Sequence, residues 1–522
     1  MKTSRIKNVL HNMWEGTFFQ IVSFIMGFVS RTIFIRILSA EYLGINSLFT
    51  NILTILSFAE LGIGHAIIFN LYKPIKENDE KKINALLNFY KRVYFLIGLV
   101  IIVVGIILTP FLPNLISKMP NIDENIYLIY LMFLFDTAIS YFFTYRLSII
   151  TADQKNYIVV RVTQCFKLIQ IVVQMSILFL THNYYLYLAI QLSNTLITFL
   201  YLSYKSKKMY PFTKKLGKEN VSKTEKNKIF KNVKALFINK FSSVILNGTD
   251  SIIISKYIGI YILGLYSNYL LIISAITQVL SQLLNSFTAS IGNLNTEKEI
   301  EKKEKIFNML YYFTILIFGV IGICLYVLFN DFITIWLGES YLLSKLTVGA
   351  IVLHFYVNGV QFSTFTYRQT AGLFREYKYF PILAVILNIS LSIILAKYIG
   401  IAGVFFATSI SRLATAGWID PIVVFKNVFK KKSISYFIKY LYYIIVVLIS
   451  LTITSLISNI INASDIKLFI AKGFITFIAA SLCIILFTLK TKEFREIYNL
   501  VKEFINNFLK RNRSNHEENN NI

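Results

Sequence analysis

Long apolar runs alternate along this chain with short polar segments, and most of the runs are about as long as a bilayer is thick. A membrane-spanning helix needs about 20 predominantly apolar residues. With boundaries good to a few residues, we expect spans at about 13–37, 46–70, 88–110, 124–148, 158–180, 184–204, 235–257, 264–290, 306–329, 345–367, 380–396, 401–420, 437–460 and 468–489. The pattern predicts an all-α polytopic membrane protein with about 14 transmembrane helices.

The longest polar segment between spans, residues 205–234, is rich in Lys, and we interpret it as a linker between two halves of six spans. After the last span, Phe494, Ile497 and Tyr498 begin a three- and four-residue apolar period, which is typical of a helix on a membrane surface. The expected organisation is an N-lobe at 1–204, a basic cytoplasmic linker at 205–234, a C-lobe at 235–428, two extra spans at 429–490, an amphipathic surface helix at 491–510 and a disordered tail at 511–522.

An internal repeat supports the two halves. Leu43-Gly44-Ile45 matches Leu263-Gly264-Leu265 at an offset of 220 in the numbering, and Phe-Thr-Tyr-Arg at 143–146 recurs at 365–368, an offset of 222. Because each half contains an even number of spans, the halves share one orientation, as in transporters built from parallel repeats. The prediction is two pseudo-symmetric six-helix lobes with a site between them, followed by two extra C-terminal helices.

The chain contains 53 Lys and Arg against 27 Asp and Glu, a formal charge of +26, although 56% of its residues are hydrophobic. If the spans alternate in direction, the large majority of the basic residues fall in loops on one side. Cytoplasmic loops carry such an excess, so we expect a multi-pass protein of the cytoplasmic membrane with both termini in the cytoplasm. The same rule explains the charge without nucleic acid, which we do not expect as a partner.

Charged side chains inside spans cost ~2.5–3.5 kcal/mol each on insertion scales, so they normally face protein or water. The sequence places these groups near mid-depth or in the inner third of spans: Arg31, Glu60, Asp136, Asp250, Arg412, Lys167 and Lys240. Arg36 and Lys472 are close enough to the outer surface to extend to it. Arg31 and Asp250 fall at nearly equivalent depths in the repeat. We hypothesise an ion pair between them, the alternative being that each is neutralised within its own half.

Some of these charges belong to polar stripes on single helix faces. The stripes are Thr50, Thr54, Ser57 and Glu60; Gln164, Lys167, Gln170 and Gln174; and Ser274, Gln278, Ser281, Gln282 and Asn285. Residues at these spacings share one face of a helix. A stripe of this kind either lines a water-filled cavity or forms hydrogen bonds between packed helices. For the stripes that include a charge, we favour the cavity.

The sequence carries no recognisable catalytic or nucleotide-binding motif. The three Cys lie far apart within spans, so neither a disulfide framework nor a metal site is expected. His65 and His354 are interpreted as packing histidines, and Asp420-Pro421 as the kink or end of a helix. We therefore expect no cofactor and no metal, and a transporter rather than an enzyme.

The segments LSAEYLGINSLF (38–49), LSFAELGIG (56–64) and LYKP (71–74), together with Arg31, resemble the opening of bacterial polysaccharide flippases of the Wzx type. These belong to the multidrug/oligosaccharidyl-lipid/polysaccharide exporter superfamily. The resemblance implies that an undecaprenyl-pyrophosphate-linked oligosaccharide moves from the inner to the outer leaflet by alternating access of two lobes. It also implies a cationic central cavity, onto which Arg31, Lys167, Lys240 and Arg412 map by residue type and depth.

The resemblance leaves several points open. Glu60, Asp136 and Asp250 are the candidates for coupling to Na⁺ or H⁺ or for gating. The expected partners are a lipid-linked oligosaccharide, membrane lipids and polysaccharide assembly proteins. The alternatives are a multidrug or cation antiporter, or a lipid II flippase, of the same superfamily, and further a membrane polysaccharide polymerase. An antiporter would favour carboxylates in its cavity, whereas basic groups at least match acidic ones inside these spans.

Overall fold

The computed structural model describes residues 20, 22–60, 63–214, 220–500 and 502–503, and these fold into helices without any strand. They form two compact units, Met1–Leu271 and Ile272–Ile522, with the boundary inside one long helix. The predicted all-α class is confirmed. The lobe boundaries at residues 204, 235 and 428 stay predictions, because the compact units follow contacts rather than the repeat.

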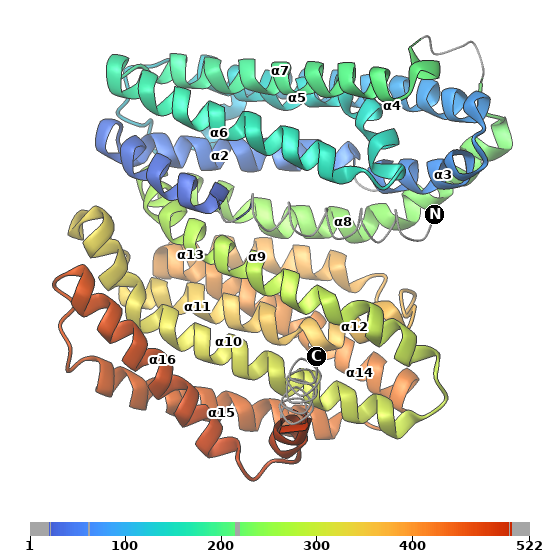
Figure 1. The fold of residues 1–522 in the computed structure, drawn as a ribbon. Helices are drawn as coiled ribbons and strands as arrows, with labels where there is room; N and C mark the ends of the chain where they lie inside the picture. Colours follow the sequence, from blue (N-terminus) through green and yellow to red (C-terminus); the bar gives the residue numbers. More distant parts are fainter. Residues whose placement is uncertain (1–19, 21, 61–62, 215–219, 501, 504–522) are drawn as a thin grey trace, which may run out of the picture. The chain divides into compact units, whose positions relative to one another are not determined.

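The first unit begins with helical residues 22–37 and continues through helices that run back and forth (Figure 1). Its elements are α2 (Ala40–Leu56), η1 (Ser57–Glu60), α3 (Ile63–Glu77), α4 (Glu80–Leu108), η2 (Thr109–Leu115), α5 (Ile126–Ala152), α6 (Asn156–Thr181), α7 (Tyr184–Met209), η3 (Pro211–Thr213), α8 (Lys223–Tyr257) and the start of α9 (Ile260–Thr296). Within it, α5 packs along both α4 and α7. The predicted second span is therefore not one helix, since η1 separates α2 from α3.

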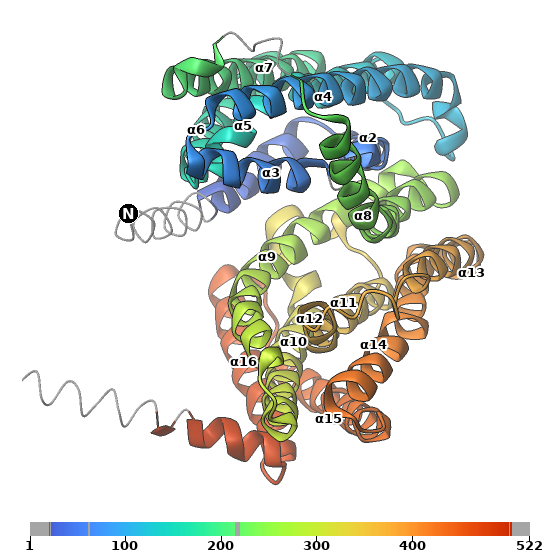
Figure 2. The same cartoon turned by 90° about the vertical axis from the view of Figure 1, so that its right-hand side faces the viewer.

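The second unit contains the rest of α9 and a bundle around α10, which contacts α11, α15 and α16 (Figure 2). Its elements are α10 (Ile300–Leu337), η4 (Glu339–Tyr341), α11 (Lys345–Val360), α12 (Phe362–Thr370), α13 (Phe380–Ala414), α14 (Ala416–Val424), the π-helical η5 (Phe425–Phe429), α15 (Ile434–Ser458) and α16 (Ile466–Thr488). Inside α13 the chain turns at Gly400, whose φ of +60° favours glycine. This turn separates the two predicted spans at 380–396 and 401–420.

Local sequence fixes where many of these helices begin. A short polar side chain precedes the helix and accepts a hydrogen bond from a backbone N–H of its first turn, which otherwise has no partner. Ser39, Asp79, Asn125, Asn183, Ser222, Ser344 and Asp465 act in this way. Most of these caps lie at or near the predicted ends of spans, where the chain re-enters the bilayer.

Ten helices of the described residues are long and apolar enough to cross a membrane, and one of these, 380–429, contains the turn at Gly400. The other predicted spans are not among these ten helices, each for a local reason. Span one starts among residues outside the described part, span two is divided by η1, and span seven lies in α8, which also holds a charged stretch. About 14 crossings are consistent with this arrangement.

The two extra C-terminal spans are integral parts of the second unit rather than peripheral additions. Val320 and Ile323 of α10 pack with Val446 of α15 and with Ala480 and Ile484 of α16. Hydroxyls also bond between helices: Ser458 with Thr476 at 2.8 Å and Tyr312 with Thr488 at 2.7 Å. Small and hydroxylated residues of this kind hold helices together where lipid provides no hydrophobic driving force.

Lys472 corrects the sequence interpretation. Its side chain is only 8% exposed, and its Nζ lies 2.7 Å from Asp331 Oδ2 on α10. It therefore neutralises a carboxylate inside the bundle instead of extending to the membrane surface. Arg36, by contrast, is exposed as expected.

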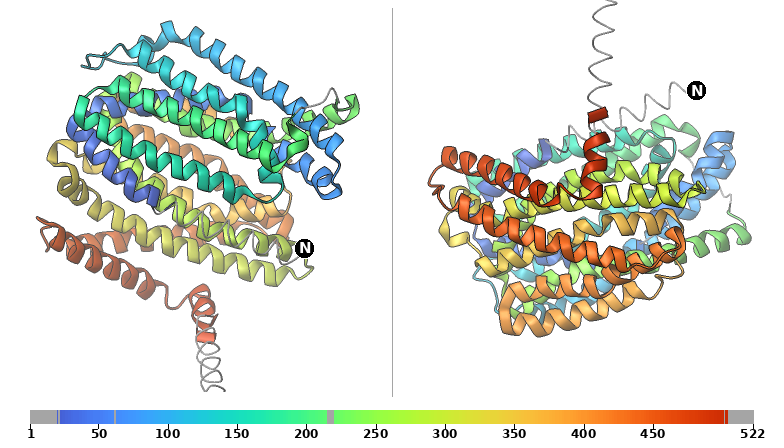
Figure 3. Two further views of the ribbon diagram at one scale, coloured as in Figure 1. Left: turned by 45° about the horizontal axis from the view of Figure 1, so that its top comes forward. Right: turned by 90° about the horizontal axis from the view of Figure 1, so that it is seen from below.

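Polar contacts anchor the described ends of the linker and of the C-terminal segment, whose helical residues are red in Figure 3. Asn84 Nδ2 donates to the carbonyl oxygen of Phe212 at 3.0 Å, and Lys82 pairs with Glu225. This pairing lowers the pKa of the Glu225 carboxyl, mainly through the hydrogen bond from Lys82. Residues 492–500 are helical, and Glu493 pairs with Lys439 of α15. The predicted surface helix at 491–510 stays a prediction, and the tail at 511–522 lies outside the described residues.

Candidate functional site

Arg31 lies on the helix formed by residues 22–37, near the start of α9. Its Nη1 donates to Ser267 Oγ at 2.9 Å, and Ser267 Oγ donates to the carbonyl oxygen of Gly264 at 2.7 Å. Tyr187 of α7 is close enough to interact with the guanidinium electrostatically. In this conformation the bond that the structure gives Arg31 is to Ser267, and the ion pair with Asp250 stays a hypothesis.

Asp250 lies on α8 beside the small polar face that meets α2. Its neighbour Ser251 accepts a hydrogen bond from Asn51 Nδ2 at 3.0 Å, and Tyr266 of α9 is within electrostatic range of the carboxylate. Lys240 belongs to α8 too, but its side chain lies outside the described part of the chain. The structure therefore places Arg31 and Asp250 in the same compact unit, each with its own partners.

Glu60 sits where the second span breaks. The 3₁₀ turn η1 ends at this residue, and the phenols of Tyr94 and Tyr141 interact with its carboxylate electrostatically. A short 3₁₀ stretch inside a long helix often marks a hinge or a functional position. Discontinuous helices also form many binding sites in membrane transporters. The sequence identified the charge, and the structure adds the break.

Asp136 of α5 is held from one side only. Its Oδ2 accepts a hydrogen bond from Gln191 Nε2 of α7 at 2.8 Å, while Oδ1 is buried and has no hydrogen-bond partner among the described residues. Buried polar atoms are nearly always bonded. A carboxyl group with one unbonded oxygen inside the bilayer is therefore a place where a proton or a small cation could bind.

The stripe that contains Lys167 divides into two parts. Gln170 Oε1 accepts from Asn194 of α7 at 2.8 Å, and Gln174 Nε2 donates to the carbonyl oxygen of Tyr187 at 2.9 Å. These amides join α6 to α7, so for them the hydrogen-bonding interpretation is correct. Lys167 itself is exposed and remains available to a ligand.

Arg412 lies on α13 in the second unit, opposite α11. Its Nη1 donates to Asn358 Oδ1 at 2.8 Å, and this bond is on an exposed part of the unit. His354 lies one turn before Asn358 on α11, and its Nδ1 is buried without a hydrogen-bond partner in the described residues. Arg412 is within electrostatic range of His354. The three side chains bring hydrogen-bonding groups and a positive charge to one place.

Two helix breaks lie close to Arg412. Span ten is interrupted at Gln361, between α11 and α12, and span twelve at Thr415, between α13 and α14. The breaks meet, because a Cβ added to Gly417 would lie 2.9 Å from Gln361 Nε2 and 3.4 Å from the carbonyl oxygen of Arg412. Irregular backbone at membrane depth is tolerated where protein buries it or where it lines a cavity. Arg412 and the two breaks are therefore a candidate place in the second unit for binding a polar group.

An ion pair that the sequence interpretation missed lies in the same unit. Arg368 of α12 and Asp420 of α14 form it in a buried position, with Arg368 Nε 2.8 Å from Asp420 Oδ1. The guanidinium also lies over the ring of Tyr377, with its Cζ 3.9 Å from the ring centroid. The expectation that Asp420-Pro421 ends a helix is wrong, since α14 continues through Pro421 to Val424, whereas a kink there stays a prediction. The repeated Phe-Thr-Tyr-Arg sequence was the available signal for Arg368.

The stripe on α9 is the most exposed of the three. Ser274, Gln278, Ser281, Gln282 and Asn285 all present exposed side chains along a helix that is apolar enough to span a membrane. A polar face turned toward hydrocarbon would leave its hydrogen-bonding groups unsatisfied, at a cost of several kcal/mol in the worst cases. This face is therefore suited to contact water or a polar ligand rather than lipid.

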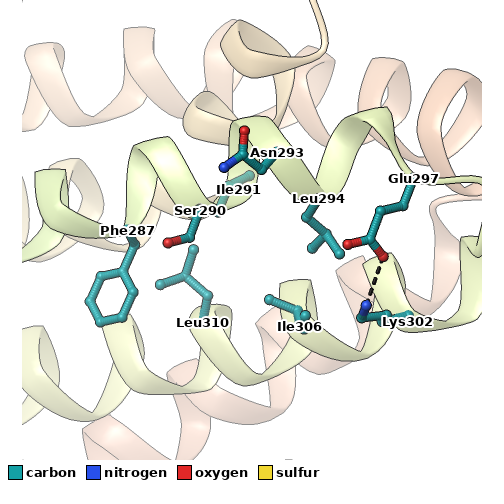
Figure 4. Close-up of a pocket in the computed structure, with 9 residues that line it drawn as sticks. All are labelled: Phe287, Ser290, Ile291, Asn293, Leu294, Glu297, Lys302, Ile306 and Leu310. Atoms are coloured by element: carbon teal, nitrogen blue, oxygen red, sulfur yellow. Dashed lines mark hydrogen bonds and ion pairs between the residues drawn. The ribbon is translucent and has the colours of Figure 1, made fainter.

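A separate cavity of about 350 Å³ lies between the end of α9 and the start of α10 (Figure 4). Phe287, Leu294, Ile306 and Leu310 supply apolar walls, and Lys302 Nζ lies 2.7 Å from Glu297 Oε2 at one end. Because this cation is already paired with a carboxylate, the cavity is less suited to an anionic group than the surroundings of Arg412.

Comparison with known proteins gives one family and one fold. A family model described as "Polysaccharide biosynthesis protein" matches residues 9–288, more than half of the chain. No curated protein sequence matches.

Among solved structures, the lipid II flippase MurJ in an inward closed conformation shares 17% identity over 92% of this chain and 99% of its own, with a TM-score of 0.63. An inward-facing multidrug resistance MATE family transporter of the MOP superfamily shares 15% identity over 74% and 90%, with a TM-score of 0.60. A mutant of the Vibrio cholerae MATE transporter VcmN shares 13% over 82% and 99%, with a TM-score of 0.52. At these identities the likeness shows the fold of multi-pass membrane transporters.

Proposed function

Because the chain belongs to the polysaccharide biosynthesis protein family and has the fold of multidrug/oligosaccharidyl-lipid/polysaccharide exporters, we propose that it is a flippase for lipid-linked oligosaccharides. The substrate is an oligosaccharide unit joined through pyrophosphate to undecaprenol. It moves from the inner to the outer leaflet of the cytoplasmic membrane, with both termini of the protein in the cytoplasm. The product supplies the synthesis of a surface polysaccharide.

The observation that carries the proposal is the exposed polar face of α9. A sugar headgroup that crossed hydrocarbon would lose hydrogen bonds to water at each hydroxyl, at several kcal/mol for the worst cases. Serine, glutamine and asparagine side chains replace those bonds. The headgroup can then stay hydrated while the lipid chain remains in the bilayer.

Arg412 supports an anionic substrate. An arginine can bind a phosphate through two parallel hydrogen bonds, and Asn358 already orients one edge of this guanidinium. Arg31, Lys167 and Lys240 are proposed as further cationic positions on the substrate pathway. An inside-negative membrane potential also favours outward movement of an anion, by ~2.3 kcal/mol per charge per 100 mV.

Asp136 is the proposed coupling residue, because one of its oxygens is buried without a partner among the described residues. Glu60, at the break of span two, and Asp250, beside the contact between α2 and α8, are proposed as gating residues. The same carboxylates would suit a cation antiporter of the same superfamily, which is the second candidate function. The observation that favours the antiporter is the buried Asp136 oxygen that has no hydrogen-bond partner among the described residues.

Deletion and complementation test the proposal. Loss of the gene should abolish a surface polysaccharide and leave its lipid-linked precursor on the cytoplasmic side, and the wild-type gene should restore the polysaccharide. Complementing genes with Arg412→Ala or Arg375→Ala are compared, and only the loss of Arg412, the proposed substrate-binding cation, should lower the surface polysaccharide. An unchanged surface glycan in the deletion strain would refute the flippase. Altered sensitivity to cationic drugs instead would support the antiporter.

A further inference from the structure

Two glycines make a backbone contact that no other residue could make. Gly44 lies one turn into α2, and a Cβ added to it would overlap the carbonyl group of Ile260 at the start of α9. Gly264 lies one turn into α9, and a Cβ added there would overlap the carbonyl group of Ala40 at the start of α2. Because the obstacles are backbone atoms, a side chain cannot be accommodated by a change of rotamer.

The contact is reciprocal within the sequence repeat. Ala40 corresponds to Ile260, and Gly44 to Gly264, at the offset that relates the two copies of the Leu-Gly motif. The first copy therefore touches the second in the same way as the second touches the first, as at a two-fold axis in a symmetric dimer. A repeat that diverged elsewhere has kept both glycines at this point.

Two hydrogen bonds accompany the glycine contact, and they follow the repeat too. Arg31 Nη1 donates to Ser267 Oγ at 2.9 Å, and Asn51 Nδ2 donates to Ser251 Oγ at 3.0 Å. Positions 31 and 251 are related by the same offset, so equivalent positions of the two copies each bond to the opposite copy. Hydrogen bonds and van der Waals contacts between helices can separate and re-form, unlike a covalent link.

The contact lies at the starts of α2 and α9. α2 and α9 each begin immediately after the turn that follows an odd-numbered span, one and seven, so both starts lie on the same side of the membrane. In the predicted orientation this is the outer side. Small residues let helix backbones approach closely, and backbone atoms in contact leave no space for water or for a headgroup.

We propose that Gly44 and Gly264 form the outer gate of the transporter, which is closed in this structure and opens when the starts of α2 and α9 separate. This inference rests on the proposed transport function, because a gate has a role only in a protein that transports a substrate. Arg31 and Asn51 stabilise the closed state through their bonds to Ser267 and Ser251.

Accessibility to an external thiol reagent tests the gate. The background replaces Cys165, Cys324 and Cys483 by Ser, and Ser274→Cys supplies a reporter farther along α9 than Gly264. A membrane-impermeant maleimide is then applied to the outside of intact cells. Gly44→Ala and Gly264→Ala should each speed labelling about tenfold, because the added methyl group disfavours only the closed contact.

Gly27→Ala is the matched control. Gly27 is helical as well, and a Cβ there would meet nothing within 4 Å, so labelling should stay at the rate of the parent. Equal rates in all three glycine variants would overturn the proposal. Faster labelling only from the cytoplasmic side of inverted vesicles would also overturn it, because the contact would then close the inner end.

A reversible cross-link covers the case in which the alanine variants fail to reach the membrane. Asn51→Cys with Ser251→Cys, in the Cys-free background without the reporter, can be bridged by a short bifunctional thiosulfonate. Bridged cells should lose export of surface polysaccharide, and a reducing agent should restore it. Export at the unbridged rate would refute the gate. The labelling assay needs no substrate, so the gate and the proposed substrate can fail independently.

Discussion

Arg146 and Arg368 end the same four-residue sequence, Phe-Thr-Tyr-Arg, in the first and second compact units, and both side chains are buried. Their partners differ. Arg146 Nη1 donates to the carbonyl oxygen of Thr213 at 2.7 Å, and its Nε donates to Tyr145 Oη at 3.1 Å. Arg368 instead forms an ion pair with Asp420. A full charge is thus held by neutral groups in one unit and by an opposite charge in the other.

The difference shows what a repeat preserves. The arginine and its depth at the end of the span have been kept, whereas the group that compensates its charge has changed. In the first unit the arginine fixes the beginning of the linker, since Thr213 lies in η3 directly after α7. In the second unit it joins α12 to α14. We expect the energetic consequences of losing each arginine to differ accordingly.

Loss of Arg368 should have the largest effect on stability. Arg368→Gln leaves the Asp420 carboxylate buried without its counter-charge, which typically costs ~3–5 kcal/mol. Thermal unfolding of the purified protein in detergent measures this. The double variant Arg368→Gln with Asp420→Asn should recover much of the loss. If the double variant is as unstable as the sum of the single variants, the two groups do not act as a pair.

Loss of Arg146 should cost less. Arg146→Gln removes the donor that bonds to the carbonyl and the hydroxyl of Thr213 and to the hydroxyl of Tyr145. It leaves no buried opposite charge, so we expect a loss of ~1.5–3 kcal/mol. It should also release the linker, which trypsin applied to the cytoplasmic face would cut faster. Arg375→Gln, an exposed arginine on the loop after α12, is the control. A larger loss of stability than in Arg368→Gln would reverse the comparison.

The second anchor of the linker should contribute less to stability than either Arg146 or Arg368. Lys82 and Glu225 form a partly exposed pair, and such pairs contribute about 0–1 kcal/mol. Because the pairing lowers the pKa of the Glu225 carboxyl, its stabilisation is present above the ordinary glutamate pKa of about 4.3. It is lost as the pH falls through the lower pKa of the folded protein. Glu225→Gln should therefore differ from the parent at pH 7 and match it at the acid limit. A difference that persists there would assign another role to Glu225.

Arg412 differs from Arg146 and Arg368, because we expect its loss to affect export more than stability. Its bond to Asn358 is exposed and leaves no buried opposite charge behind, so Arg412→Ala should destabilise the protein less than Arg368→Gln does. Loss of a charge-assisted hydrogen bond to the substrate should lower export by about ten- to a hundredfold. Quantified surface polysaccharide, alongside protein level in the membrane, separates the two readouts. Normal export by Arg412→Ala would remove this residue from the substrate pathway.

Much of the fold follows from the sequence, because the bilayer requires each span to be a long apolar helix. The all-α class and most spans are confirmed, as is the division at Gly400 between spans eleven and twelve. The break of span two at Glu60 was not predicted, because the apolar run continues past Glu60 and Gly62 was not interpreted as a break. The site could be predicted only as a set of charges at membrane depth. Of that set, the structure gives distinct partners to Arg31, Asp136 and Arg412.

Two misinterpretations have one physical cause. Lys472 was assigned to the membrane surface and Asp420 to the kink or end of a helix, because hydropathy and proline describe each residue on its own helix. Their partners, Asp331 and Arg368, lie on other helices, α10 and α12. Whether a charge is paired depends on which helices pack together, and the pattern along one helix does not contain that information.

By itself, the sequence determined that this chain crosses a membrane many times, and which residues carry charge where hydrocarbon surrounds the helix. Both follow from the cost of placing polar groups in lipid, which acts on each segment separately. Only the tertiary structure decided which of those charges are neutralised and which stay exposed, and that Gly44 and Gly264 meet. These outcomes depend on contacts between segments that are distant in the sequence, and close packing allows such contacts only at particular positions.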